Sequence, residues 1–83
     1  MNAKIKKKIH KITDLCFDAK DFGHDCFLRY MSHVESLSLD IHKNGWNGEK
    51  ETDIHVDFYL NKEDAETKLD EVIECLENLI QES

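Results

Sequence analysis

The chain has 83 residues, a net charge of −7 and a charged fraction of 35%, which is the size of a single domain, 1–83, with a modest core. No apolar run approaches the roughly 18 to 20 residues that cross a bilayer, and the lysine-rich start lacks the continuous apolar stretch of a signal peptide. The acidic balance argues against nucleic acid as the main partner, because phosphate binding needs a clustered basic surface. We therefore expect a cytoplasmic protein.

Residues 3–20 are predicted to form an amphipathic helix. Its apolar side chains recur at spacings of four and three residues, which places them on one stripe: Ile5, Ile9, Ile12, Cys16 and Ala19. The residues that follow, 21–25, contain Gly23, which we expect to end the helix with a positive φ.

Three strands are predicted next, the first over residues 26–31. In the second, Leu37, Leu39 and Ile41 alternate with polar residues, and in the third Ile54, Val56, Phe58 and Leu60 do the same. Such alternation predicts an antiparallel sheet with one apolar face and one wet face. The loop between these strands, 43–52, contains two Asn-Gly steps, which favour turns.

A second helix is predicted after Asn61, which would be its N-cap, with Glu63 and Asp64 in the first turn. Its apolar stripe consists of Ala65, Leu69, Val72, Leu76 and Leu79. The order α-β-β-β-α predicts an α+β fold in which a three-stranded antiparallel meander carries both helices on one face.

The polar face of the sheet is the first candidate site. If Leu39 pairs with Val56, then Asp40 lies opposite His55 and His42 lies opposite Asp53, with Asp57 and Tyr59 further along. Two histidines among carboxylates can bind a transition metal or supply a general base. Cross-strand acid–histidine pairs more often serve only to stabilise a sheet, and we favour that interpretation, with no catalytic residue, no metal and no cofactor.

The single tryptophan is the second candidate. Trp46 lies between the two Asn-Gly steps, so it either folds over the end of the sheet or projects as an anchor for a partner, since interface hot spots are enriched in tryptophan. The candidate partner-binding residues are Trp46, Asp40, His42, His55, Asp57 and Tyr59. The three cysteines form no Cys-x-x-Cys pair, so we expect reduced thiols.

Several short motifs carry a resemblance to a known class of proteins. They are the run 30–34 (Tyr-Met-Ser-His-Val), the alternating strand 37–41, the Asn-Gly-Trp loop 44–46 and the strand end Tyr59-Leu60. In these motifs the chain resembles the short acidic proteins encoded by phages and prophages of Gram-positive bacteria, over residues 27–80. The lysine-rich first helix is not part of that pattern. The resemblance implies a phage context and stoichiometric binding to a host defence protein or to a nucleotide signal.

Three functions follow from these observations. The leading one is a non-enzymatic, phage-encoded protein that binds a host protein, as an inhibitor of host defence, and forms a homodimer or larger assembly. The alternative is an oligomer that sequesters a nucleotide-like signal, with Trp46 or Tyr59 stacking on the base and Arg29 on the phosphate. The third is a metal-dependent enzyme that uses the His/Asp face.

Chelation tests the metal-free interpretation. Because the apolar stripes supply a complete core, EDTA is expected to leave thermal unfolding unchanged. A drop in the midpoint of more than about 10 °C, well over 1 kcal/mol at this size, would contradict it.

Overall fold

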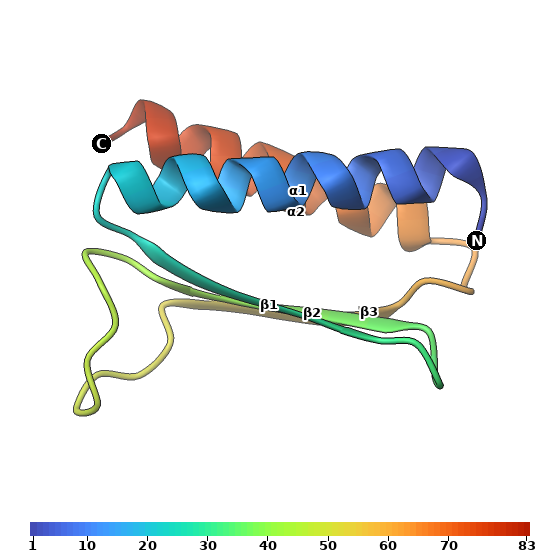
Figure 1. Cartoon of the computed structure of the whole chain (residues 1–83), viewed down its shortest axis with the longest axis horizontal. Coiled ribbons are helices and arrows are strands. Elements are labelled where there is room, and N and C mark those ends of the chain that lie inside the picture. The colour runs from blue at the N-terminus through green and yellow to red at the C-terminus, as the bar shows by residue number, and fades with distance from the viewer.

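The structure, a computed structural model that describes residues 1–83, has two layers (Figure 1). The helices α1 (Ala3–Asp21) and α2 (Ala65–Gln81) form one layer. The strands β1 (Asp25–Met31), β2 (Ser36–His42) and β3 (Ile54–Tyr59) form the other, in the order β1-β2-β3 with β2 in the middle. Both helices lie over the same face of the sheet, so the predicted α+β fold is confirmed.

The sheet has the register that the alternation predicted. Leu39 of β2 faces Leu28 on one side and Val56 on the other, and Asp40 faces His55. Because side chains alternate between faces, Leu37, Leu39 and Ile41 all point toward the helices, where each is almost fully buried. The central strand therefore supplies the sheet side of the core.

The ends of α1 follow local sequence chemistry. The Asn2 side chain accepts a hydrogen bond from the Ile5 backbone N–H at 2.9 Å, which caps the helix. At the other end Gly23 has φ +88°, and the backbone N–H groups of Gly23 and His24 donate to carbonyls of the last turn. A positive φ with such bonds is the usual glycine termination of a helix.

The prediction that Asn61 caps α2 is wrong. The helix begins at Ala65, after a turn over residues 60–64 in which the Ala65 N–H donates to the Lys62 carbonyl. Asp64 occupies the cap position and makes no side-chain capping bond, and Glu66 is the acid of the first turn. The turn connects the sheet layer with the helix layer, and the helix begins only after the chain has passed from one layer to the other.

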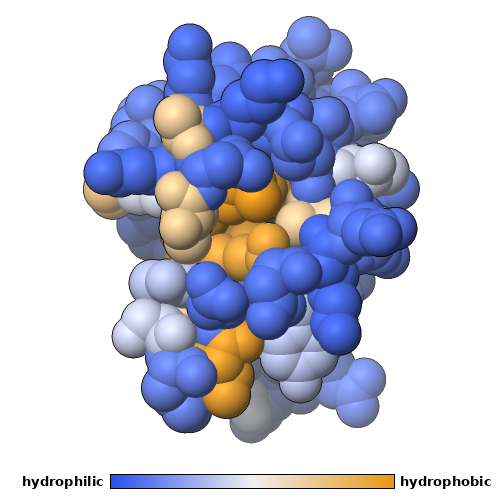
Figure 2. Space-filling model, turned by 90° about the vertical axis from the view of Figure 1, so that its right-hand side faces the viewer, coloured by the Kyte–Doolittle hydropathy of each residue, from blue (hydrophilic) through white to orange (hydrophobic).

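The core lies between the two layers and draws on every element except β1 for its buried residues. Figure 2 shows apolar side chains gathered between a hydrophilic helix layer and the sheet, at the end where α1 begins. The buried apolar side chains form one cluster: Ile5, Ile12, Leu15, Leu37, Leu39, Ile41, Phe58, Leu60, Ala65, Leu69, Val72, Leu76 and Leu79.

The basic first helix and the acidic last helix meet within one molecule. Lys8 forms an ion pair with Asp70, and Lys11 lies 3.8 Å from Glu77. Exposed pairs of this kind stabilise a fold by only about 0.2–1 kcal/mol each. The packing of the two helices therefore depends mainly on their buried apolar side chains. Neither helix combines the length and the apolar content required of a membrane-spanning segment.

Truncation of a core side chain tests this packing. Leu69 is fully buried in the core cluster, so Leu69→Ala should lower the free energy of unfolding by about 2–5 kcal/mol. Val34→Ala, in the exposed turn between β1 and β2, is the control and should change it little. Urea unfolding of both variants provides the measurement; an equal loss in the two would contradict the core described here.

Candidate functional site

One face of the sheet has no helix on it, and we call it the outer face (Figure 1). Side-chain alternation and the strand register assign its positions. From β1 to β3 these are Asp25, Phe27, Arg29, Met31, Ser36, Ser38, Asp40, His42, His55, Asp57 and Tyr59. Five of the six residues predicted to bind a partner lie on this face: Asp40, His42, His55 and Asp57 in its polar part, and Tyr59 near the end of β3.

The prediction that the whole outer face is wet is wrong for its central row. Ser36, Ser38 and His42 are buried, although no helix covers them. The neighbouring strands place longer side chains on either side, such as Met31 and Tyr59 flanking Ser36. The large side chains of the two edge strands therefore shield the small polar residues of the middle strand.

Asp40 is the charged centre of this face. His55 Nδ1 lies 2.5 Å from one of its carboxylate oxygens, and Arg29 lies 3.7 Å from the other. The predicted Asp40–His55 juxtaposition is therefore present. Asp40 is mostly shielded, whereas the Arg29 and His55 side chains are more than half exposed, so the group presents the Arg29 guanidinium and the His55 ring to solvent.

His42 lies on the outer face as predicted, but no hydrogen bond joins it to Asp53. Its ring meets Phe27 edge-on at 5.3 Å and lies 3.5 Å from the Thr52 hydroxyl. Its Nδ1 is buried without a partner, as is the Ser36 hydroxyl. Asp53, predicted to lie opposite, bonds instead to the loop. The His42 ring thus packs against the Phe27 ring, and His42 is only 5% exposed.

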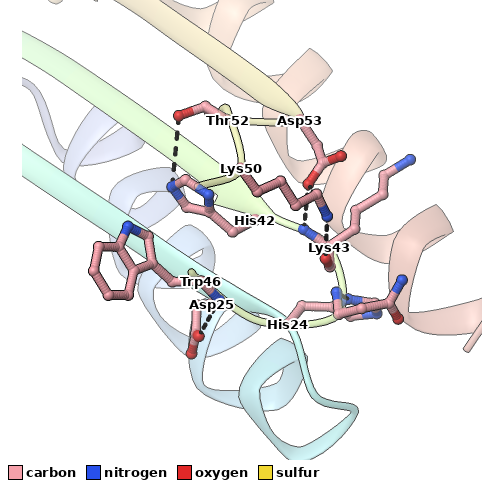
Figure 3. A network of polar contacts seen from close by, with 9 residues as sticks. His24, Asp25, His42, Lys43, Trp46, Lys50, Thr52 and Asp53 are labelled. Carbon is pink, nitrogen blue, oxygen red and sulfur yellow. Dashed lines mark hydrogen bonds and ion pairs between the residues drawn. The ribbon is translucent and has the colours of Figure 1, made fainter. Parts of the chain in front are cut away.

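The loop that carries Trp46 is tied to the sheet by two carboxylates (Figure 3). Asp25 accepts a hydrogen bond from the Trp46 backbone N–H at 2.7 Å, and Asp53 accepts one from the Lys43 N–H at 2.7 Å. Lys50 braces the second anchor, with its ammonium 3.0 Å from Asp53 and 2.8 Å from the Lys43 carbonyl. The loop is therefore fixed near both of its ends.

Both anchors are ionised more readily than ordinary carboxyls. The Lys20 ammonium, 2.8 Å away, and then the Trp46 N–H lower the pKa of Asp25 below its usual 3.8. Lys50 and then the Lys43 N–H lower the pKa of Asp53 in the same way. These hydrogen bonds favour the charged form, so the anchors persist at neutral pH.

The anchored loop leaves its indole exposed. The Trp46 side chain points away from the polar network in Figure 3, and the residue is 58% exposed. The sequence left a packed and an exposed position open, and the structure has the exposed one. Asn44 and Gly45 have φ values of +64° and +99°, so the first Asn-Gly step makes the turn that leads to Trp46.

Trp46 is held at Asp25, the outer-face position next to Phe27. Phe27, Met31 and Tyr59 are 41%, 42% and 53% exposed on the same face. We call these four residues the aromatic patch: Phe27, Met31, Trp46 and Tyr59. Sequence reasoning missed Phe27 and Met31, although the alternation Phe27, Arg29, Met31 in β1 would have assigned them to the face opposite Leu28.

The remaining chemistry-bearing residues do not converge. No group of three or more histidine, cysteine, aspartate or glutamate side chains is arranged to hold a metal ion. The three cysteines are free and half-buried. The Cys16 thiol hydrogen-bonds to Cys26, which raises the pKa of Cys16 and lowers that of Cys26, while burial raises the pKa of Cys75.

Comparison of the chain with protein-family models, with curated proteins and with solved structures found no match.

The anchors of the Trp46 loop can be tested by acid. A carboxyl whose pKa is lowered in the folded state contributes stability above its unfolded value, near 3.8, and loses it as the pH falls through the folded value. We expect the fluorescence anisotropy of the single tryptophan to stay constant from pH 7 to about pH 5 and to fall below pH 3.8.

Asp25→Ala should release the loop already at pH 7 and lower the anisotropy there. Asp18→Ala removes an exposed acid of α1 that makes no ion pair and serves as the control. Equal anisotropy in Asp25→Ala and the unmodified protein would contradict the role of Asp25 as an anchor.

Proposed function

We propose that this protein is a non-enzymatic binding protein that acts by stoichiometric contact of its outer face with another protein. The observation that supports the proposal is the aromatic patch, which places four large, exposed side chains around one uncovered sheet face. Isolated exposed apolar residues are ordinary on a protein surface, but several on one face are typical of an interaction site. Aromatic residues and methionine are also the types enriched in interfaces.

The loop geometry favours the same interpretation. Two carboxylates fix the backbone of the loop, yet the Trp46 ring remains in solvent. An anchor that is held in place before binding loses little conformational freedom when a partner covers it. A tryptophan used only for packing would be expected to lie against the core.

The polar residues of the outer face would supply the polar part of such an interface. Arg29, His55 and Asp57 are exposed beside the patch, and an interface commonly combines apolar areas with polar ones. The protein as a whole is acidic, with a net charge of −7, so long-range attraction would favour a basic partner. Phe27 and Trp46 lie toward one end of the strands, and Met31 and Tyr59 lie toward the other. The charged group around Asp40 lies between them, so the fitting partner surface has two apolar areas with a polar area between them.

The motif resemblance adds a biological context to the proposal. Under it, the bound protein is a host protein met by a phage product, and binding inhibits it, as expected for an antagonist of host defence acting in the host cytoplasm. The nucleotide alternative receives less support, because Arg29, its candidate phosphate ligand, already lies 3.7 Å from Asp40.

Two exposed aromatic residues on opposite layers allow a matched test. Affinity capture from host lysate would identify a bound protein, and titration calorimetry with the purified partner would give stoichiometry and affinity. Trp46→Ala should weaken binding by about 2 kcal/mol or more, roughly 30-fold, with an unchanged melting temperature. Phe17→Ala, on the helix layer and 68% exposed, should leave both unchanged.

Equal affinity of the unmodified protein and Trp46→Ala would contradict the proposed surface. Recovery of a small molecule without any bound protein would contradict protein binding itself and favour the nucleotide alternative.

A further inference from the structure

The strand β3 forms an open edge of the sheet. The Leu60 N–H donates to the Glu35 carbonyl, and these residues lie opposite each other when the β2–β3 register is extended by one step. Backbone groups of an antiparallel strand alternate in direction, so those of Val56 and Phe58 face β2. The backbone groups of His55, Asp57 and Tyr59 therefore point outward, where no strand is present.

A groove runs along this edge on the helix side. It has a volume of about 300 Å³ and lies between β3 and α2. Ile54 and Val56 form one wall, and the α2 wall consists of Lys68, Glu71, Val72 and Cys75. Ile54, Val56 and Cys75 are only partly buried there. The β3 edge is the more open of the two, because α1 packs more extensively on β1 than α2 does on β3.

Natural sheets usually protect an open edge with proline, lysine or a bulge. The chain contains no proline, and β3 contains no lysine. A strand without proline, lysine or a bulge, with free backbone groups and a partly apolar groove beside it, can receive a further strand. Main-chain hydrogen bonds would form along the edge, and apolar side chains would enter the groove.

We propose that the occupant is a second copy of this chain, whose own β3 pairs antiparallel with the first about a two-fold axis at Val56. The sheet then continues through both copies. In this register Val56 faces Val56 of the second copy, and Ile54 faces Phe58 of the second copy. These apolar side chains lie on the helix side, where they fill the groove.

Charge decides the register and favours self-association. With the axis at Val56, His55 lies opposite Asp57 of the second copy, and symmetry repeats that contact. With the axis at Asp57, two carboxylates would face each other, which destabilises a sheet. His55 uses Nδ1 toward Asp40, and its Nε2 has no partner in the chain, so an imidazolium there can also bond to Asp57 of the second copy.

The pairing leaves Phe27, Met31 and Trp46 free, whereas Tyr59 belongs to β3 and lies at the border of the paired strands. Trp46 lies beyond the strand ends, and the outer faces of the two copies form one surface that carries two patches. This inference therefore does not rest on the proposed function, and Trp46→Ala should not change the assembly.

Register-specific cross-linking is the sharpest test. Opposed residues without mutual backbone bonds have Cα atoms about 4.5 Å apart, within disulfide range. Val56→Cys should therefore cross-link into dimers under mild oxidation. Ile54→Cys should not, because the two copies of that residue would lie roughly 13 Å apart. Both variants carry Cys75→Ala, because Cys75 lines the same groove.

The mass in solution provides the second measurement. Sedimentation equilibrium of the unmodified protein at high micromolar concentration should give twice the mass of 9.7 kDa. Asp57→Pro removes an outward N–H of β3, at an edge where proline is tolerated, together with the carboxylate that would face His55 of the second copy, so it should give a folded monomer by circular dichroism and mass.

A charge substitution completes the design. His55→Lys keeps a cation beside Asp40 and should retain the dimer, whereas His55→Lys combined with Asp57→Lys should weaken it through like charges across the pairing. A monomer at high concentration would overturn the proposal, as would a dimer that Asp57→Pro leaves intact or equal cross-linking of the two cysteine variants.

Discussion

The structure depends on one constraint: a three-stranded sheet is covered by helices on one face only. The apolar residues of β2 are sealed beneath α1 and α2, and burial of this surface supplies most of the stability that an 83-residue domain has. No layer remains for the opposite face. The edge strands therefore cover its central row with their own large side chains, and Phe27, Met31 and Tyr59 remain partly in solvent.

The same constraint gives the loop its role. Both Asn-Gly steps fall in a segment that extends past the sheet on the side away from the helices, so the loop cannot reach the core. It is held instead by charge, through Asp25 and Asp53 and the lysines that accompany them. A loop fixed by hydrogen bonds rather than by apolar burial can keep its tryptophan exposed, and that combination joins the fold to the proposed function.

The elements and their register could be predicted because each depends on spacing within the sequence. The stripes of both helices and the alternation around Leu39 and Val56 define faces without knowledge of the neighbours. The start of α2 could not be predicted, since Asn61 has good capping chemistry but lies in the turn that climbs to the helix layer. The burial of His42 and Ser36 could not be predicted either, because it depends on the side chains that pack beside them from other segments of the chain. The Asp25 anchor joins residues 21 positions apart, and no periodicity indicates such a contact.

The central claim is that the uncovered outer face is the surface through which this protein binds a protein partner. Hydrogen–deuterium exchange of the chain alone and in complex with its captured partner tests it most directly. The account predicts slowed exchange in the loop 43–53 and in β1, with α1 and the outer side of α2 unchanged. Slowed exchange confined to the two helices, with the loop and β1 unaffected, would contradict it.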